Sequence, residues 1–244
     1  MTGQATVREH TVLAVGQPVL VISPHLDDAV FGCGELLAAC PGSVVVTAMA
    51  GRPPQYAELT PWDALAGFQP GDDVVAARRV EDRAALAVLA ARPVWLEFLD
   101  SQYRDSPTIE ALAVALDASL LEAGLATVVL PLGLFHSDHH LTHAAAIAVW
   151  RRRPDPSWFA YEDALYRKVP DLGTARLQAL QRDGVNATPV AVRHGDRREV
   201  KRRAMQQYAS QLRALATPGK PGYDDALEPE RYWRLAVASP PARG

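Results

Sequence analysis

Residues 18–30 read PVLVISPHLDDAV, and this stretch decides the fold because it runs from a strand through a polar turn into a helix. Residues 18–23 are apolar and largely β-branched, which is typical of a strand buried on both faces of a parallel sheet. The turn at 24–28 is polar, and apolar Leu36 and Leu37 favour a helix over about 30–39. Strand, turn and helix in this order are the repeating unit of an α/β protein.

The same unit recurs along the chain. Further apolar runs predict strands at residues 43–48, 94–99 and 127–132. The spacing of apolar residues predicts helices at residues 72–91, 108–123 and 143–150. Because strands and helices alternate, we expect an α/β fold with a mostly parallel sheet and helices on both faces.

The last third of the chain is less regular. It suggests strands at 158–161 and 188–193 and one amphipathic helix at 197–215. Residues 51–71 contain four prolines and no clear periodicity, and because long ordered loops are often functional we expect them to border the active site. With no repeat or low-complexity linker, we expect a single domain over 1–244, with its core at about 18–215.

Composition excludes several classes of protein. The chain has 244 residues, 48% of them hydrophobic, which is enough for one sizeable core. The net charge is −3 and the arginine runs lie beside predicted helices, so we expect no nucleic-acid-binding surface. The first residues lack the apolar segment of a secretion signal, and no apolar run is long enough to span a membrane. We therefore expect a soluble, cytoplasmic protein.

Histidine and aspartate gather in two loops. SPHLDD at 23–28 and HSDHH at 136–140 each follow a predicted strand and precede a predicted helix. In an open α/β sheet such strand ends lie at one edge, where ligands bind, so we expect the two loops to meet. Four of the seven histidines fall within residues 136–143, which favours a metal site over an ordinary helix cap.

Imidazole and carboxylate side chains suit zinc, and a catalytic zinc site uses three protein ligands and one water. Two histidines and one aspartate leave a net charge of about +1 with Zn²⁺, and such a site lowers the pKa of its water towards ~7. Adjacent Asp27 and Asp28 cannot easily both bind one metal, so we expect one ligand and one base. His136 is expected to stabilise the oxyanion or to protonate the leaving amine, with Asp138 tuning its pKa.

The two loops resemble the signature motifs of the PIG-L family, also called the LmbE-like deacetylases. PHLDDA at 24–29 resembles the motif A/S-H-P-D-D-E, and HSDH at 136–139 resembles H-P-D-H. Three further segments resemble conserved parts of the family: RRVE at 78–81, YRDS at 103–106 and KRRAMQQYASQ at 201–211. The resemblance spans about 18–215, which is most of the chain.

This resemblance implies a Rossmann-like fold and a zinc ion bound by His25, Asp28 and His139. It also implies Asp27 as the general base and His136 as the group that stabilises the tetrahedral intermediate. Iron(II) or another divalent cation suits the same ligands, because histidine and aspartate do not select zinc strictly.

The reaction that the resemblance implies is hydrolysis of the N-acetyl group of an N-acetylglucosamine-type sugar conjugate. Arg78 and Asp105 would contact this small-molecule substrate. Arg78 is equally compatible with an ion pair to Glu81 or Asp82 on its own helix. That alternative stays open from the sequence.

Three positions depart from the family pattern. Leu26 and Ser137 replace prolines, and Ala29 replaces a glutamate whose work would fall to another residue, such as Glu35. The form SPHLDDAV resembles a branch that acts on sugar conjugates of secondary metabolism, including glycosylated peptides. Two alternatives stay open: another metal-dependent hydrolase, such as a phosphoesterase with two metals ~4 Å apart, and a non-catalytic sugar-binding homologue.

Overall fold

The structure is a computed structural model that describes residues 12–13, 15–56, 58–193 and 195–238. Within these ranges one sheet has the strand order β1-β7-β8-β6-β5-β2-β3-β4. Its strands are β1 (Val12–Leu13), β2 (Leu20–Ser23), β3 (Val44–Thr47), β4 (Arg92–Trp95), β5 (Thr127–Pro131), β6 (Ser157–Tyr161), β7 (Val185–Val192) and β8 (Tyr232–Val237).

Eight α-helices and two short 3₁₀ segments accompany these strands in the described residues. The helices are α1 (Asp28–Ala39), α2 (Pro61–Ala66), α3 (Val74–Val88), α4 (Ile109–Ala123), α5 (Ser137–Arg152), α6 (Leu172–Arg182), α7 (Arg198–Met205) and α8 (Ala209–Leu215). The 3₁₀ segments are η1 (Ser101–Tyr103) and η2 (Asp224–Leu227).

The centre of the sheet is parallel and reverses its order at β2. Residue Leu20 of β2 pairs with Val44 of β3 on one side and with Val128 of β5 on the other. The chain therefore builds β3 and β4 outward from β2, then returns to add β5 and β6 on the opposite side. Among the strands in the described residues, β8 alone runs antiparallel to its neighbours, β6 and β7. The carboxyl ends of β2 and β5 lie beside the switch point, where open α/β sheets bind ligands.

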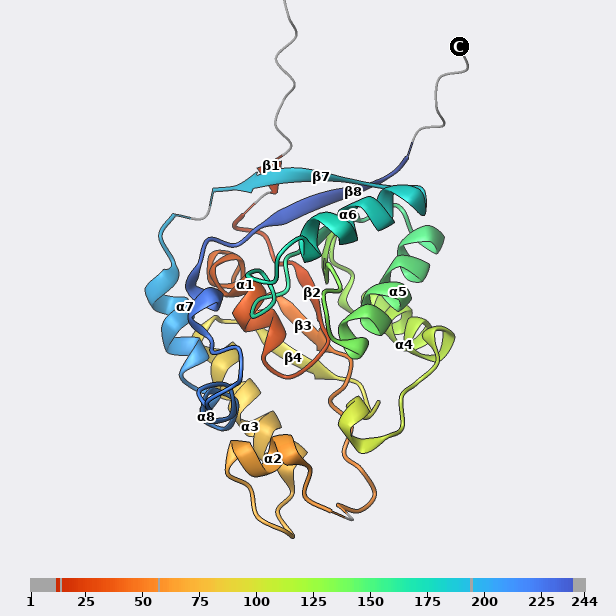
Figure 1. Cartoon of the computed structure of the whole chain (residues 1–244). Helices are drawn as coiled ribbons and strands as arrows, with labels where there is room; N and C mark the ends of the chain where they lie inside the picture. The colour runs from red at the N-terminus through yellow and green to blue at the C-terminus, as the bar shows by residue number, and fades with distance from the viewer. Residues whose placement is uncertain (1–11, 14, 57, 194, 239–244) are drawn as a thin grey trace, which may run out of the picture.

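Helices cover both faces of the sheet, as Figure 1 shows, and the side chains along β2 alternate between these two faces. Leu20 and Ile22 are buried in the core that includes residues of α4, α5 and α6. Val19 and Val21 are buried in the second core, with residues of α1, α3 and α7. Successive residues of a strand point to opposite faces, so an unbroken apolar run fills two layers at once. The predicted Rossmann-like α/β fold is confirmed.

The structure differs from the sequence-based prediction in the last third of the chain. Segment 197–215 forms two helices, α7 and α8, because the buried Tyr208 between them leaves helical geometry and donates its hydroxyl to Asp82 at 2.7 Å. Helix α6 and strand β8 were not predicted, and the helix predicted at 143–150 begins already at Ser137.

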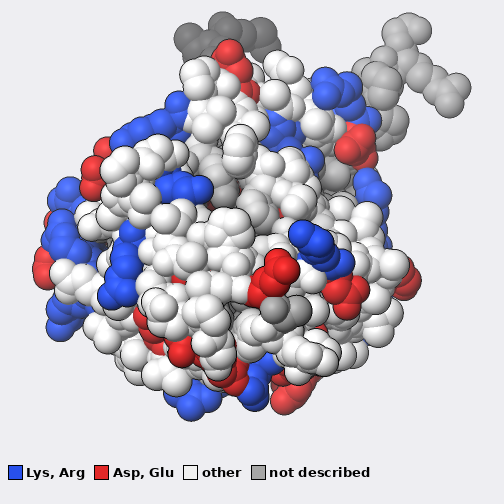
Figure 2. Space-filling view, turned by 60° about the horizontal axis from the view of Figure 1, so that its bottom comes forward, with Lys and Arg blue, Asp and Glu red and all other residues white. Residues whose placement is uncertain are grey.

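No helix in the described part of the chain is long and apolar enough to cross a membrane. On the face shown in Figure 2, lysine and arginine side chains are interspersed with aspartate and glutamate, and uncharged residues fill much of the centre.

Candidate active site

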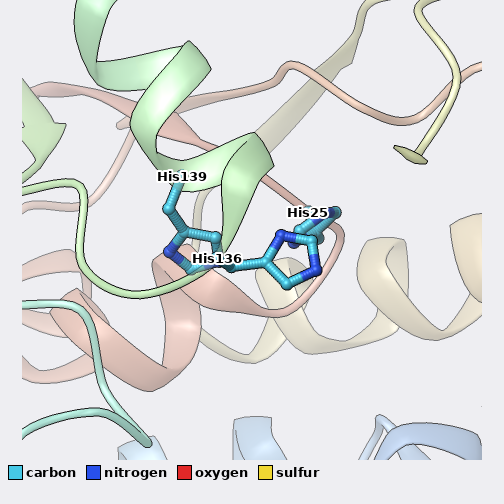
Figure 3. Close-up of side chains that lie close together, drawn as sticks. All are labelled: His25, His136 and His139. Atoms are coloured by element: carbon cyan, nitrogen blue, oxygen red, sulfur yellow. The ribbon is translucent and has the colours of Figure 1, made fainter. Parts of the chain in front are cut away.

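The two polar loops meet at the switch point, at the amino ends of α1 and α5. Asp28 lies between two histidines: its Oδ2 atom is 3.1 Å from His25 Nδ1 and 3.2 Å from His139 Nε2. The backbone N–H of His25 also donates to Asp28 Oδ2, at 2.9 Å. Figure 3 shows His25, His136 and His139 gathered within one small space. Residues more than a hundred positions apart thus form one cluster, as the sequence predicted.

Two further carboxylates hold the outer nitrogens of these histidines. Asp138 Oδ2 is 3.0 Å from His25 Nε2 and also accepts the backbone N–H of Ser101 at 3.0 Å. Asp163 Oδ1 is 2.5 Å from His139 Nδ1. A carboxylate on one ring nitrogen fixes the tautomer and aims the other nitrogen, which is how histidine ligands of metals are usually oriented.

Asp163 was missed by the sequence analysis. Its side chain is buried, and its Oδ2 accepts the backbone N–H groups of Gly133 (2.9 Å) and Leu134 (3.2 Å), which begin the loop to His136. A signal was present, because Glu162 and Asp163 directly follow the strand suggested at 158–161, where a third polar strand end reaches the same edge.

The charges of the cluster suit a cation. Burial works to lower the pKa of His139, but Asp28 and Asp163 outweigh it and raise that pKa to about 9. Burial opposes ionisation of His25 too, yet Asp100, Asp138 and Asp28 hold its pKa well above the usual value. Surroundings that draw protons onto both histidines also attract a metal ion in their place.

The donor set fits zinc. Asp28 Oδ2 lies within 3.2 Å of one nitrogen of each histidine, and all three residues line the cavity. Two imidazoles and one carboxylate are a ligand set used by three-ligand catalytic zinc sites. His136 lies beside this set: suitable atoms of His25, His136 and His139 are within 4.8 Å of one another. His25, Asp100 and Asp138 form a second such grouping. Asp28 belongs to neither grouping, but its Oδ2 atom contacts both His25 and His139.

Asp27 occupies the position before the first residue of α1, but its side chain makes no capping hydrogen bond there. The carboxylate instead lines the cavity. Burial and the neighbouring Asp28 raise the pKa of Asp27 to about 6, against the opposing effect of Arg78. A carboxylate with this pKa is suited to accept a proton near neutral pH.

His136 caps α5 through its ring. Its Nδ1 accepts the backbone N–H of Asp138 at 3.2 Å, so the neutral ring carries its proton on Nε2 and can donate it to a substrate oxygen. Burial, and then the positive His25 and His139, lower the pKa of His136. The charge of Asp138 raises that pKa to a smaller extent, whereas the Asp138 carboxylate itself is hydrogen-bonded to His25.

A cavity of about 350 Å³ opens above the cluster. Its polar wall includes Arg78, whose Nη2 donates to Gln211 Oε1 at 3.1 Å and whose Nη1 is 3.9 Å from Asp100. Arg78 Nε has no hydrogen-bond partner among the described residues. The alternative pairing on its own helix is not seen: Glu81 accepts from Ser210, and Asp82 accepts from Trp95 and Tyr208.

Other predicted residues are placed differently. Asp105 is exposed, outside the residues that line the cavity, and Asp100 contributes the carboxylate of that wall instead. The assignment of Asp105 as a substrate contact stays a prediction. His143 Nδ1 contacts Pro131 O at 2.8 Å rather than His139, and Glu35 accepts the N–H of Arg197. The loop at 51–71 does border the cavity, through Trp62 of α2.

A mostly parallel sheet with a histidine- and aspartate-lined cavity at its switch point defines a Rossmann-like α/β enzyme. The sequence model of the family described as GlcNAc-PI de-N-acetylase, PIG-L, matches residues 20–150. The chain therefore belongs to the PIG-L family of deacetylases.

Solved structures agree with this assignment. The A40926 pseudoaglycone deacetylase Dbv21 is 26% identical with a TM-score of 0.74, over 92% of this chain and 99% of that chain. A triple mutant of a deacetylase from the teicoplanin biosynthetic pathway is 25% identical with a TM-score of 0.74, over 91% and 99%. The zinc-inhibited form of teicoplanin deacetylase Orf2 shares the fold at 23% identity and a TM-score of 0.71, over 91% and 99%. A comparison with curated proteins gave no match.

Proposed function

We propose that this protein is a zinc-dependent N-deacetylase that hydrolyses the acetamide of an N-acetylglucosamine-type sugar conjugate. The observation that carries the proposal is that one oxygen of Asp28 contacts both His25 and His139. The carboxylate of the adjacent Asp27 does not cap helix α1 and is available as a base. We also infer that the chain acts as one domain, because a single sheet contains strands from both ends of the described chain.

Zinc held by His25, Asp28 and His139 would supply Lewis acidity that makes a water nucleophilic at neutral pH. Asp27 takes one proton from this water as the water oxygen bonds to the amide carbon. The Nε2–H group of His136 donates to the carbonyl oxygen while that oxygen gains negative charge. The proton on Asp27 then passes to the nitrogen as the C–N bond breaks, so the products are acetate and a free amine.

The polar wall of the cavity supports a sugar as the part of the substrate that carries the amide. Arg78, Asp100 and Gln211 present donors and acceptors within one cavity, which suits neighbouring hydroxyl groups. The similarity to a pseudoaglycone deacetylase and to a deacetylase of the teicoplanin pathway supports a conjugate of secondary metabolism as the substrate. Arg78 remains our candidate substrate contact.

Substitution of Asp27, the proposed general base, tests the mechanism. We expect Asp27→Ala to bind about one zinc per chain, as the wild type does, and to lose roughly 10²-fold or more in amine release, because general-base catalysis contributes about that much. Metal content and free-amine release from methyl N-acetyl-β-glucosaminide measure the two effects. His139→Ala should lose both metal and activity, while the exposed Asp155→Ala should lose neither.

Full activity of Asp27→Ala at equal metal loading would contradict the base assignment. Release of phosphate from phosphoesters, with two metals per chain, would favour the phosphoesterase alternative. Sugar binding without amine release from any N-acetylated sugar would favour the non-catalytic alternative.

A further inference from the structure

The cavity has an apolar wall that the proposed chemistry does not use. Phe135, Leu165 and Tyr166 form this wall, which we call the aromatic lip. The rings of Phe135 and Tyr166 are stacked, with centroids 5.2 Å apart and planes 27° apart. Tyr166 also packs edge-on against the metal-ligand candidate His139, at 5.4 Å. The lip therefore begins beside His139 and ends in the exposed ring of Phe135.

Two residues of the lip have an unfavourable backbone conformation. Phe135 has φ +57° and Leu165 has φ +72°, both in the left-handed region that non-glycine residues seldom adopt. Hydrogen bonds to buried carboxylates hold both segments: Asp163 accepts from the residues just before Phe135, and Asp225 accepts the N–H of Leu165 at 2.6 Å. Strain maintained in this way at two places on one cavity indicates a functional role.

The exposure of Phe135 points to a ligand rather than to the protein core. Its side chain is 63% exposed although it is stacked on Tyr166, so the strained backbone presents an aromatic face to solvent. A flat apolar group that stacks on this face of Phe135 would remove from water both that face and its own surface.

We propose that the aromatic lip binds a flat apolar substituent attached to the sugar of the substrate, so that the protein prefers aryl-type glycoconjugates to simple N-acetylglucosamine. This rests on the proposed function. An acetyl group ends one carbon beyond the reacting carbonyl and has no flat face to stack on Phe135, whereas the sugar can carry a flat substituent that does. The polar residues of the cavity, Arg78, Asp100 and Gln211, are left for the sugar hydroxyls.

The test compares three substrates by amine release: methyl N-acetyl-β-glucosaminide, its 4-nitrophenyl counterpart, and methyl N-octanoyl-β-glucosaminide. We expect kcat/KM of the wild type to be on the order of tenfold higher for the aryl than for the methyl acetamide, as apolar subsites typically discriminate. In Phe135→Ala and Tyr166→Leu this ratio should fall towards one. Leu121→Ala, which removes a comparably exposed side chain from α4, should keep the wild-type ratio.

Equal kcat/KM for the two acetamides in the wild type would overturn the proposal. So would a Phe135-dependent preference for the octanoyl amide, which would assign the lip to the acyl chain.

If no substrate releases amine, the proposed function fails. Binding of 4-nitrophenyl β-glucoside, which has no amide, then tests separately whether the aromatic lip binds an aryl group. Calorimetry should then show at least severalfold weaker binding to Phe135→Ala than to Leu121→Ala. Equal binding to these two variants would overturn the proposal.

Discussion

At the scale of single residues, Asp163 connects two parts of the site that the sequence places far apart. One of its oxygens holds His139 Nδ1, and the other accepts two backbone N–H groups of the loop that leads to His136. Since the side chain of Asp163 is buried, this geometry is shielded from water. If His139 binds a metal as proposed, Asp163 would therefore act on that metal through His139, as a positioning residue.

We expect Asp163→Asn to weaken zinc binding by about 10- to 100-fold, the usual cost of removing a carboxylate behind a histidine ligand. The amide cannot act as a charged acceptor for His139 Nδ1–H, so the Nε2 lone pair is no longer aimed at the metal. Chelator competition measures the zinc Kd, and the absorption spectrum of the cobalt-substituted protein reports the ligand geometry.

Asp155→Asn is the matched control, because Asp155 is exposed and lies outside the residues that line the cavity. If Asp163→Asn binds zinc as tightly as this control, with the same cobalt spectrum, the positioning role is wrong.

At the scale of elements, α7, α8 and the break between them attach the C-terminal segment to the site. Lys201 forms a buried ion pair with Glu230 at 2.8 Å, and Glu230 also accepts the N–H groups of Glu35 and Leu36 beside the kink in α1. Gln211 reaches the cavity wall through Arg78. The motif KRRAMQQYASQ is thus a series of contacts to different elements rather than one continuous helix.

Asp82 of α3 makes the contact at the break, and it gives the stability of the fold a pH dependence. Burial raises the pKa of Asp82 to about 6, despite hydrogen bonds from Trp95 and Tyr208 that lower it. The folded state therefore binds this proton more tightly than the unfolded chain, whose carboxyl has a pKa near 3.8. The contribution of Asp82 to the unfolding free energy is most favourable below pH ~4, decreases as the pH rises to about 6, and is constant above it.

Asparagine at position 82 cannot ionise. We expect the unfolding free energy of Asp82→Asn minus that of the wild type to increase by about 2 kcal/mol between pH 4 and pH 6.5, because most of a shift of about two pKa units is lost over this range. Urea unfolding at several pH values measures the difference. A difference that is flat over this range, as we expect for Asp155→Asn, would show that Asp82 has the same pKa in the folded and the unfolded protein.

At the scale of the whole molecule, the site exists only where the order of the sheet reverses. His25 follows β2 and His139 lies in α5 after β5, and these strands are neighbours although two strands and four α-helices separate them in sequence. A metal held by both loops binds the folded chain and has no preformed site in the unfolded chain, so it stabilises the native state.

We expect zinc at 1,000 times its Kd to raise the unfolding free energy by about 4 kcal/mol, and chelation to reverse this. Thermal unfolding with zinc and with chelator measures the shift in Tm. His139→Ala should show little response to either. An equal Tm for the wild type in both conditions would mean that the two loops do not share a metal.

Local patterns in the sequence were sufficient for the main architecture. The apolar strand at 18–23 and the polar turn after it predicted β2 and the start of α1, because a buried strand needs a continuous apolar run and its loop carries the polar groups. The same reasoning predicted β3, β5, α3 and α4. It failed at Tyr208, where a long-range hydrogen bond to Asp82 overrides helical periodicity, and at β8, whose pairing depends on distant strands.

The sequence by itself determined the α/β class and the two loops rich in histidine and aspartate, because residue type and strand–turn–helix order are local properties. The choice of His25, Asp28 and His139 as candidate metal ligands came from the resemblance of these loops to the family motifs. Only the tertiary structure decided which carboxylates surround them. Asp163 stands behind His139, Asp100 lines the cavity where Asp105 was expected, and Asp138 holds His25. These contacts join residues from different strand ends, so they depend on the three-dimensional path of the chain, which short-range sequence patterns do not encode.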